Sequence, residues 1–290
     1  MKNKKTPFGI EEKYTQYQNS KFCIIKAGYA ESVTFIKGAE NGPDKIIEVS
    51  DQLELYDWES KTEPYLHGIS LLEIDPNKKI NYVLKDIEKN VSQCVEDNKL
   101  PILLGGEHTV TIGAIRALKE KFSNFTVIQI DAHADLRDEY MGSKYNHACP
   151  MRRIIEMDIP CIQLGIRSIA KEEVQAVEQG LNTKIYYCDN ASPDLKIIDK
   201  IPTGNVYLTI DLDGFDPSIF PDVGTPEPGG LGWFETVNFI KKLIKKRNLI
   251  GFDIVELCPK NDENPNSAFA AAKLLYKIMG FYTKYDLQQF

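Results

Sequence analysis

The residues with the clearest chemical potential stand at 131–135, where the sequence reads Asp-Ala-His-Ala-Asp directly after the apolar run 125–130. Successive side chains of an extended chain point to opposite faces, so Asp131, His133 and Asp135 would project to one side. Two carboxylates and one imidazole form a ligand set that suits divalent cations such as Mn²⁺. The array therefore predicts a metal site at the end of a strand.

A second acidic array has the same relation to a strand. Asp211 and Asp213 follow the apolar run 206–210, and both can face one side of an extended chain. A single Asp-x-Asp pair could equally be a helix cap or a pair of loop carboxylates. Two such arrays favour metal binding, because carboxylates that point together repel one another unless cations neutralise them. The ligands of both arrays together predict two ions bridged by shared carboxylates, roughly 3.5–4 Å apart.

Histidines supply a third element. Residues 104–110, Leu-Gly-Gly-Glu-His-Thr-Val, lead from a strand through two glycines into a helix that opens with His108. A lone histidine at such a place is usually a cap or a surface residue. The chain has four histidines, however, and His108, His133 and His147 all lie in or near these strand-end elements. This concentration favours a ligand role for His108 and leaves His67 as a bystander.

Alternating strand and helix patterns predict the scaffold that must position these residues. Apolar β-branched runs alternate with amphipathic stretches from about residue 20 onward, which is typical of an α/β fold whose parallel sheet is covered on both faces. Such sheets place ligands outside the carboxyl ends of their strands, where the chemical residues gather. The predicted strands are 22–27, 101–104, 125–130, 161–164, 184–188, 206–210 and 249–255. The predicted helices are 42–53, 81–98, 108–121, 171–179, 233–246 and 266–279.

Composition and charge exclude several classes of function. The 290 residues are 42% apolar and 27% charged, as in a globular protein, and a net charge of −7 argues against a nucleic-acid partner. No run approaches the roughly 18 apolar residues of a membrane span, and the N-terminus lacks the apolar stretch of a secretory signal. Six scattered cysteines are typical of reduced thiols in a cytoplasmic protein. We expect residues 21–290 to form one domain, preceded by a polar, loosely attached N-terminal arm at 1–20.

Three motifs together resemble the ureohydrolase family, which includes arginases, agmatinases, guanidinobutyrases and formiminoglutamases. They are Gly-Gly-Glu-His at 105–108, Asp-Ala-His-Ala-Asp at 131–135 and Asp-Leu-Asp-Gly-Phe-Asp-Pro at 211–217, in the order found in the family. A weaker match lies at 35–43. The resemblance covers nearly the whole chain, and three motifs in order are far more specific than one. It implies a three-layer arginase-like fold with a mostly parallel central sheet, and a homotrimer or homohexamer.

The resemblance also implies a ligand set for two Mn²⁺ ions per subunit. The first ion would be held by His108, Asp131, Asp135 and Asp211, and the second by Asp131, His133, Asp211 and Asp213. Asp131 and Asp211 would bridge the two. Ni²⁺, Co²⁺ and Zn²⁺ tolerate such ligands as well. Family enzymes hydrolyse a guanidino or similar group, with metal-bound hydroxide as the nucleophile.

Two further residues match family positions. His147 matches the histidine that assists proton transfer to the leaving amine, and Glu256 matches the carboxylate that binds the substrate guanidinium through paired charged hydrogen bonds. The alternatives are a loop histidine bonded to the backbone at His147 and a surface glutamate paired with lysine at Glu256.

The loops resemble those of agmatinases more closely than those of arginases. Arginine carries an α-carboxylate that agmatine lacks, and the loop at 136–153 and the segment at 224–230 are similar to agmatinase loops. The residues at 148–149 and 209 depart from the commonest agmatinase pattern. The sequence thus predicts a cytoplasmic, dinuclear manganese agmatinase that hydrolyses agmatine to putrescine and urea.

Other interpretations are compatible with parts of this pattern. Guanidinobutyrase, arginase or formiminoglutamase activity would use the same motifs on a different substrate. Cys149 beside His147 could form a Cys-His nucleophile, although the carboxylate arrays would then have no role. A zinc-dependent deacetylase of the same general fold would need fewer carboxylates and adjacent histidines. The non-enzyme alternative is a catalytically silent binding protein on the same fold, which the presence of His147 and Glu256 disfavours.

Overall fold

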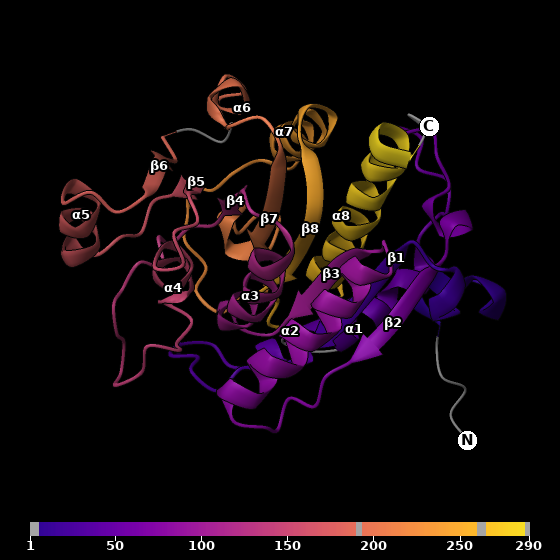
Figure 1. The fold of residues 1–290 in the computed structure, drawn as a ribbon, viewed down its shortest axis with the longest axis horizontal. Coiled ribbons are helices and arrows are strands. Elements are labelled where there is room, and N and C mark those ends of the chain that lie inside the picture. Colours follow the sequence, from indigo (N-terminus) through magenta and orange to yellow (C-terminus); the bar gives the residue numbers. More distant parts are fainter. Residues whose placement is uncertain (1–5, 190–192, 260–264, 288–290) are drawn as a thin grey trace.

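The centre of the molecule is a sheet of eight parallel strands, seen in a computed structural model that describes residues 6–189, 193–259 and 265–287 (Figure 1). The strand order is β2-β1-β3-β8-β7-β4-β5-β6. The strands are β1 (Phe22–Ala27), β2 (Ile69–Glu73), β3 (Leu100–Gly105), β4 (Phe125–Ile130), β5 (Cys161–Ile166), β6 (Thr183–Tyr187), β7 (Asn205–Asp211) and β8 (Asn248–Val255).

Helices cover both faces of the sheet, which makes three layers (Figure 1). The α-helices are α1 (Gly42–Val49), α2 (Ile80–Glu96), α3 (Thr111–Lys121), α4 (Pro150–Ile155), α5 (Lys171–Glu178), α6 (Ile197–Lys200), α7 (Trp233–Lys246) and α8 (Asn266–Tyr282). Short 3₁₀ turns are Pro7–Gly9, Glu12–Tyr14, Tyr17–Asn19, Ala39–Asn41, Ser50–Gln52, Pro64–His67, His108–Val110 and Leu212–Gly214, and a π-helical turn is Thr283–Leu287. Side chains of α1, α6, α7 and α8 pack in one apolar cluster, and those of α2, α3 and α4 in another.

The strands supply both clusters because their side chains alternate between the two faces. Phe22 and Ile24 of β1 pack in the first cluster, while Cys23 and Ile25 pack in the second. A strand buried on both faces is apolar along most of its length, and all six residues of β4 are buried. The predicted α/β fold with a helix-covered parallel sheet is therefore confirmed.

The predicted strands all occur, with ends that differ by at most two residues. The strand that was not predicted is β2. It is an edge strand whose last three residues are only partly buried or exposed, so its apolar pattern is weak. The short helices α4 and α6 were also absent from the prediction. The helix expected at 108–121 begins with the 3₁₀ turn His108–Val110 before α3 starts.

The segment before β1 is attached more firmly than its polarity suggests. Phe8 and Ile10 are only 2% and 4% exposed and belong to the first apolar cluster. The Phe8 ring lies 4.9 Å from that of Tyr276, and the Phe8 N–H donates to Ser50 Oγ at 2.8 Å. The expectation of a loosely attached arm is thus wrong for residues 6–20, because two apolar side chains anchor it. Residues 1–5 lie outside the described residues.

Candidate metal centre and active site

Four neighbouring strands bring the predicted site residues together at one edge of the sheet. In the order β3, β8, β7 and β4, the carboxyl ends of these strands lead to His108, to Glu256, to Asp211 and Asp213, and to the array at 131–135. Residues far apart in the sequence meet because parallel strands all end on the same side. This is the location at which open α/β sheets bind ligands.

The first group of candidate ligands surrounds His108. Its Nδ1 lies 3.1 Å from Asp131 Oδ2, 3.1 Å from Asp135 Oδ2 and 3.5 Å from Asp211 Oδ2. His108 is 1% exposed, and Nδ1 is a buried nitrogen that has no hydrogen-bond partner among the described residues. A buried imidazole nitrogen that faces three carboxylate oxygens without bonding to them fits a metal ion placed between them.

The second group shares Asp131 with the first. His133 Nδ1 lies 3.0 Å from Asp213 Oδ2 and 3.7 Å from Asp131 Oδ1. Asp131, His133 and Asp213 can together hold one ion, and His108, Asp131 and Asp135 another. The donor set of carboxylates and imidazoles fits divalent cations of the Mn²⁺ type.

The electrostatics of the two groups favour added positive charge. Burial and, after it, the nearby carboxylates of Asp213 and Asp135 together raise the pKa of Asp131 to about 7. Burial lowers the pKa of His133, but the carboxylate of Asp213 outweighs this and raises it to about 10. The cluster therefore attracts either protons or metal cations, and the two compete for the same atoms.

The ligand loops are not extended, which corrects one step of the sequence argument. β4 ends at Ile130, His133 forms an isolated bridge with Ser168, and Asp135 has a φ of +53°. Asp213 lies in the 3₁₀ turn after β7 and donates its N–H to Asp211 Oδ1 at 2.9 Å. The carboxylates converge because the chain turns after each strand, and not because side chains alternate along an extended backbone.

The outer nitrogen of His108 is held by groups inside the sheet. Nε2 lies 2.8 Å from Thr209 Oγ1, and that hydroxyl donates to Asp253 Oδ1 at 2.6 Å. Because the hydroxyl proton of Thr209 is donated to Asp253, the hydroxyl oxygen must accept the hydrogen bond from Nε2–H of His108. Tyr207 and Thr111 donate to the other carboxylate oxygen of Asp253 at 2.7 and 2.9 Å. In the neutral form of His108, these contacts would leave Nδ1 as the unprotonated nitrogen, as a metal ligand requires.

Glu256 and His147 lie at the same cavity as the ligands. This cavity has a volume of about 180 Å³ and is lined by Thr34, His133, Asp135, Arg137, Tyr140, His147, Ala148, Asp211, Asp213, Thr225 and Glu256. Glu256 has a left-handed φ of +65° and accepts the His108 backbone N–H on Oε1 at 2.7 Å. Burial raises the pKa of Glu256 well above its usual value, with a further contribution from Glu107. A buried carboxylate of this kind is a good partner for a cationic group.

Several groups that complete the site were not identified from the sequence. Ser32 lies on the loop after β1, and its Oγ is 3.1 Å from His147 Nδ1. Glu107 is buried within the Gly-Gly-Glu-His motif, but no feature of the sequence indicated its partners. Arg137 and Tyr140 line the cavity from the loop after β4. Of these residues, Glu107 alone stands inside a recognisable motif. The others are polar loop residues, and such residues carry no periodic signal in the sequence.

Cys149 is an unsuitable nucleophile. It is 0% exposed, burial raises the pKa of its thiol to about 12, and Sγ faces the Ser143 carbonyl at 3.9 Å. A reactive cysteine needs an accessible thiol with a lowered pKa. The Cys-His interpretation is therefore wrong.

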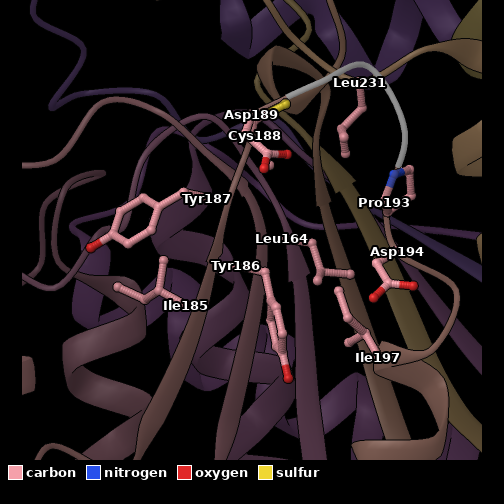
Figure 2. A pocket seen from close by; sticks show the side chains of 11 residues that line it. Leu164, Ile185, Tyr186, Tyr187, Cys188, Asp189, Pro193, Asp194, Ile197 and Leu231 are labelled. Atoms are coloured by element: carbon pink, nitrogen blue, oxygen red, sulfur yellow. The ribbon is translucent and has the colours of Figure 1, made fainter.

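A second cavity, of about 420 Å³, lies beside β5 and the edge strand β6 (Figure 2). Its walls include the side chains of Leu164, Tyr186, Tyr187 and Leu231. None of the predicted site residues lines it. The size of a cavity alone thus does not locate the candidate active site in this molecule.

No described helix is long and apolar enough to cross a membrane.

Comparisons with known proteins identify the family to which this chain is similar. The model of the arginase family matches residues 20–280. An N(1)-aminopropylagmatine ureohydrolase from Synechocystis sp. is 39% identical over 93% of this chain and 92% of its own length. An agmatinase from Pyrococcus horikoshii is 32% identical over 94% of this chain and 96% of its own. The crystal structure of agmatine ureohydrolase from Thermoplasma volcanium superposes with a TM-score of 0.87 at 32% identity, over 95% of this chain and 94% of that chain.

Proposed function

The chain belongs to the arginase family, and we propose that it hydrolyses the guanidino group of agmatine to putrescine and urea. The observation that carries this proposal is the shared cavity. Two His and Asp groups with Asp131 in common open onto the same cavity as Glu256 and His147. This arrangement combines a place for two cations, a carboxylate for a guanidinium and a histidine for proton transfer.

The metal ligands in this proposal are the residues expected from the sequence. His108, Asp131, Asp135 and Asp211 would hold one Mn²⁺, and Asp131, His133, Asp211 and Asp213 the other. When bound, the two cations lower the pKa of a water molecule, so that a nucleophile is available near neutral pH. The unbonded Nδ1 of His108 is the strongest structural support for this ligand set.

Glu256 would bind the guanidinium of the substrate. The backbone N–H of His108 donates to Oε1 and so orients the carboxylate, while Oε2 would accept an N–H of the substrate guanidinium. A planar cation with parallel N–H groups matches a carboxylate in both charge and shape. Because Glu256 is only 8% exposed, a substrate cation would neutralise it within a largely desolvated site.

His147 would move a proton to the leaving amine. The oxygen of water forms a bond with the guanidino carbon, and the bond from that carbon to the tail nitrogen breaks. Both water protons end on the tail nitrogen, which leaves as a protonated amine while urea is released. His147 would accept one of these protons and deliver it to the leaving nitrogen.

The cavity supports a substrate with an amine tail over one with a carboxylate tail. Arg137 is the only lysine or arginine among the described residues that line it. Its guanidinium is bound to Glu172 and lies 4.9 Å from the centre of the Tyr140 ring. Free arginine and guanidinobutyrate are substrates with a carboxylate tail. That carboxylate would find no unpaired lysine or arginine side chain among the described residues that line the cavity.

N1-aminopropylagmatine is a second candidate substrate. The relative at 39% identity bears the name of an enzyme for this compound, and it is more similar to this chain than the agmatinase at 32% identity. The two compounds share the same guanidino group and differ in the length of the amine tail. The chemistry at the proposed metal centre would be identical for both.

Product analysis tests the proposal. Purified protein loaded with Mn²⁺ is incubated separately with agmatine, N1-aminopropylagmatine, arginine, guanidinobutyrate and formiminoglutamate, and urea or formamide is measured. We expect urea from agmatine at the highest kcat/KM. A higher kcat/KM with N1-aminopropylagmatine would transfer the assignment to that compound, and product only from a carboxylate-tailed substrate would refute the amine-tail argument.

Metal analysis provides the matching control. We expect two Mn²⁺ per chain in the active protein and lower activity with Ni²⁺, Co²⁺ or Zn²⁺ in the same sites. Two bound ions without hydrolysis of any guanidino compound would favour the silent binding protein. The proposed setting is the cytoplasm, and the proposed assembly is a homotrimer or homohexamer, which sedimentation of the purified protein would test.

A further inference from the structure

The ring of His147 is held by a hydroxyl and a buried carboxylate from two other loops. Ser32 Oγ lies 3.1 Å from His147 Nδ1 and also accepts the His147 backbone N–H at 2.9 Å. The same hydroxyl donates to Glu107 Oε1 at 2.9 Å. Glu107 is 0% exposed, so its partners are fixed by the fold and not by solvent.

The bonding capacity of the Ser32 hydroxyl determines which nitrogen of His147 carries a proton. A hydroxyl has one proton to give and two lone pairs that accept. Glu107 takes the proton, and the backbone N–H of His147 takes one lone pair. The remaining lone pair faces His147 Nδ1, which must therefore carry a hydrogen to complete the set.

Glu107 is itself held as an acceptor. Its Oε1 also accepts from Thr109 Oγ1 at 2.7 Å, and its Oε2 accepts the Ser32 backbone N–H at 2.7 Å. Every described hydrogen bond to this carboxylate is thus a donation toward it. The Tyr140 ring stands edge-on to His147, with ring centres 6.0 Å apart, and limits rotation of the imidazole.

We propose that Ser32 and Glu107 are positioning residues that hold His147 with its proton on Nδ1 and with a bare Nε2 for the cavity. This rests on the proposed function, since it specifies how His147 accepts a proton from the water side and passes it to the leaving nitrogen. No described group makes a hydrogen bond to Nε2. A histidine with the opposite tautomer would present a donor where an acceptor is needed.

The test measures the tautomer directly and the kinetics separately. Full-length protein is labelled with ¹⁵N at its histidine side chains and loaded with Zn²⁺, which does not broaden the signals. Solid-state ¹⁵N spectra are recorded in mildly alkaline buffer, and His147→Asn assigns the His147 resonances. We expect a protonated Nδ1 and an unprotonated Nε2; a protonated Nε2 overturns the proposal whether or not any substrate is hydrolysed.

Glu107→Gln provides the sharpest variant. Its amide oxygen can still accept the Ser32 backbone N–H, and its NH₂ group then faces the two hydroxyls as a donor. The Ser32 hydroxyl proton is released toward His147 Nδ1, so we expect the proton of His147 to move to Nε2. A lower kcat by about 10²-fold or more should follow, with KM and bound metal close to wild type. An unchanged tautomer in a folded, metal-loaded variant would contradict the proposal.

Serine variants separate positioning from folding. We expect Ser32→Ala to lower kcat by about 10–100-fold with little change in KM, and Ser32→Thr to recover most of it because the hydroxyl is kept. Ser92→Ala, on α2 and outside the site, is the matched control and should behave as wild type. A Ser32→Ala variant with wild-type kcat would rule out the positioning role while leaving the assignment of the reaction intact.

Discussion

Two histidines of the site have supports of the same chemical type that are built from different parts of the fold. His108 contacts the Thr209 hydroxyl, which donates to the buried Asp253. His147 contacts the Ser32 hydroxyl, which in turn donates to a buried glutamate. In each case a hydroxyl links an imidazole to a carboxylate that water does not reach.

The difference lies in where these groups stand. Thr209 and Asp253 are partners in the register of β7 and β8, in the middle of the sheet. Ser32 and Glu107 stand on the loops after β1 and β3. The proposed metal ligand His108 is thus supported by strands, whereas His147, the proposed proton-transfer residue, is supported by loops. Because loops are generally more mobile than central strands, the two supports differ in rigidity.

Removing a shared carboxylate should have the largest effect on the strand-supported half. Asp211→Asn keeps the shape of the side chain but removes its charge beside His108. We expect activity to fall below detection and the bound metal to fall below two ions per chain, because the remaining ligands cannot hold both ions. Activity assays together with metal analysis check this result. Full activity in that variant would refute a bridging role for Asp211.

Removing the loop-supported histidine should affect only catalysis. His147→Ala leaves every proposed metal ligand in place, so we expect two bound ions and a kcat lower by about 10²–10⁴-fold, the range of general acid–base catalysis. Steady-state kinetics and metal analysis of the same sample distinguish the two halves. A loss of metal in this variant would show that the halves are not separate.

Removing the hydroxyl behind His108 should have an intermediate effect. Thr209→Val keeps the shape but leaves Nε2 of His108 without an acceptor, and outer partners of metal-bound histidines typically contribute about 10–100-fold to metal affinity. Competition with a chelator measures this affinity. Thr209→Ser, which keeps the hydroxyl, is the control and should bind metal as tightly as wild type. Equal metal affinity in Thr209→Val and wild type would mean that the contact from Asp253 through Thr209 to His108 does not strengthen metal binding.

The smallest effect concerns dynamics without any substitution. The Thr209 amide lies in a central strand that pairs with both β4 and β8, whereas the Ser32 amide lies in a loop and donates to Glu107 at 2.7 Å. We expect the Ser32 amide to exchange with deuterium at least about tenfold faster, because loops open locally without global unfolding. Hydrogen exchange followed by mass spectrometry checks this order. Equal protection would remove the contrast between a rigid and an adaptable support.

The parts of the fold predicted from sequence are those with a strong periodic signal. β4 is mostly apolar and was predicted with its observed ends, while the half-exposed β2 was missed. The α-helix α7 was likewise predicted with its observed ends. Phe8 and Ile10 were missed because two apolar residues in a polar segment make no pattern, and only the packing around them reveals their role.

In the candidate site, too, the residues within a clear sequence pattern were predicted and those outside one were not. The residues at 131–135 and at 211–213 were recognisable because acidic residues directly after apolar strands are unusual. Their backbone course was not predicted, since a left-handed φ such as that of Asp135 is uncommon for a residue other than glycine. Ser32 was not foreseen because its function comes from a contact with residue 147, and such a pairing across 115 positions leaves no local trace in one sequence.

The presence of Asp131 in both ligand groups has a consequence for metal loading. In the proposed two-ion site, an ion at one position would fix the carboxylate that the other position also needs, so each ion would act as an effector of the other. Linkage requires this influence to be reciprocal: whatever factor the first ion contributes to the affinity of the second, the second returns to the first. A titration with Mn²⁺ should therefore be described by one coupled equilibrium, and a half-loaded protein is a distinct species with its own affinity.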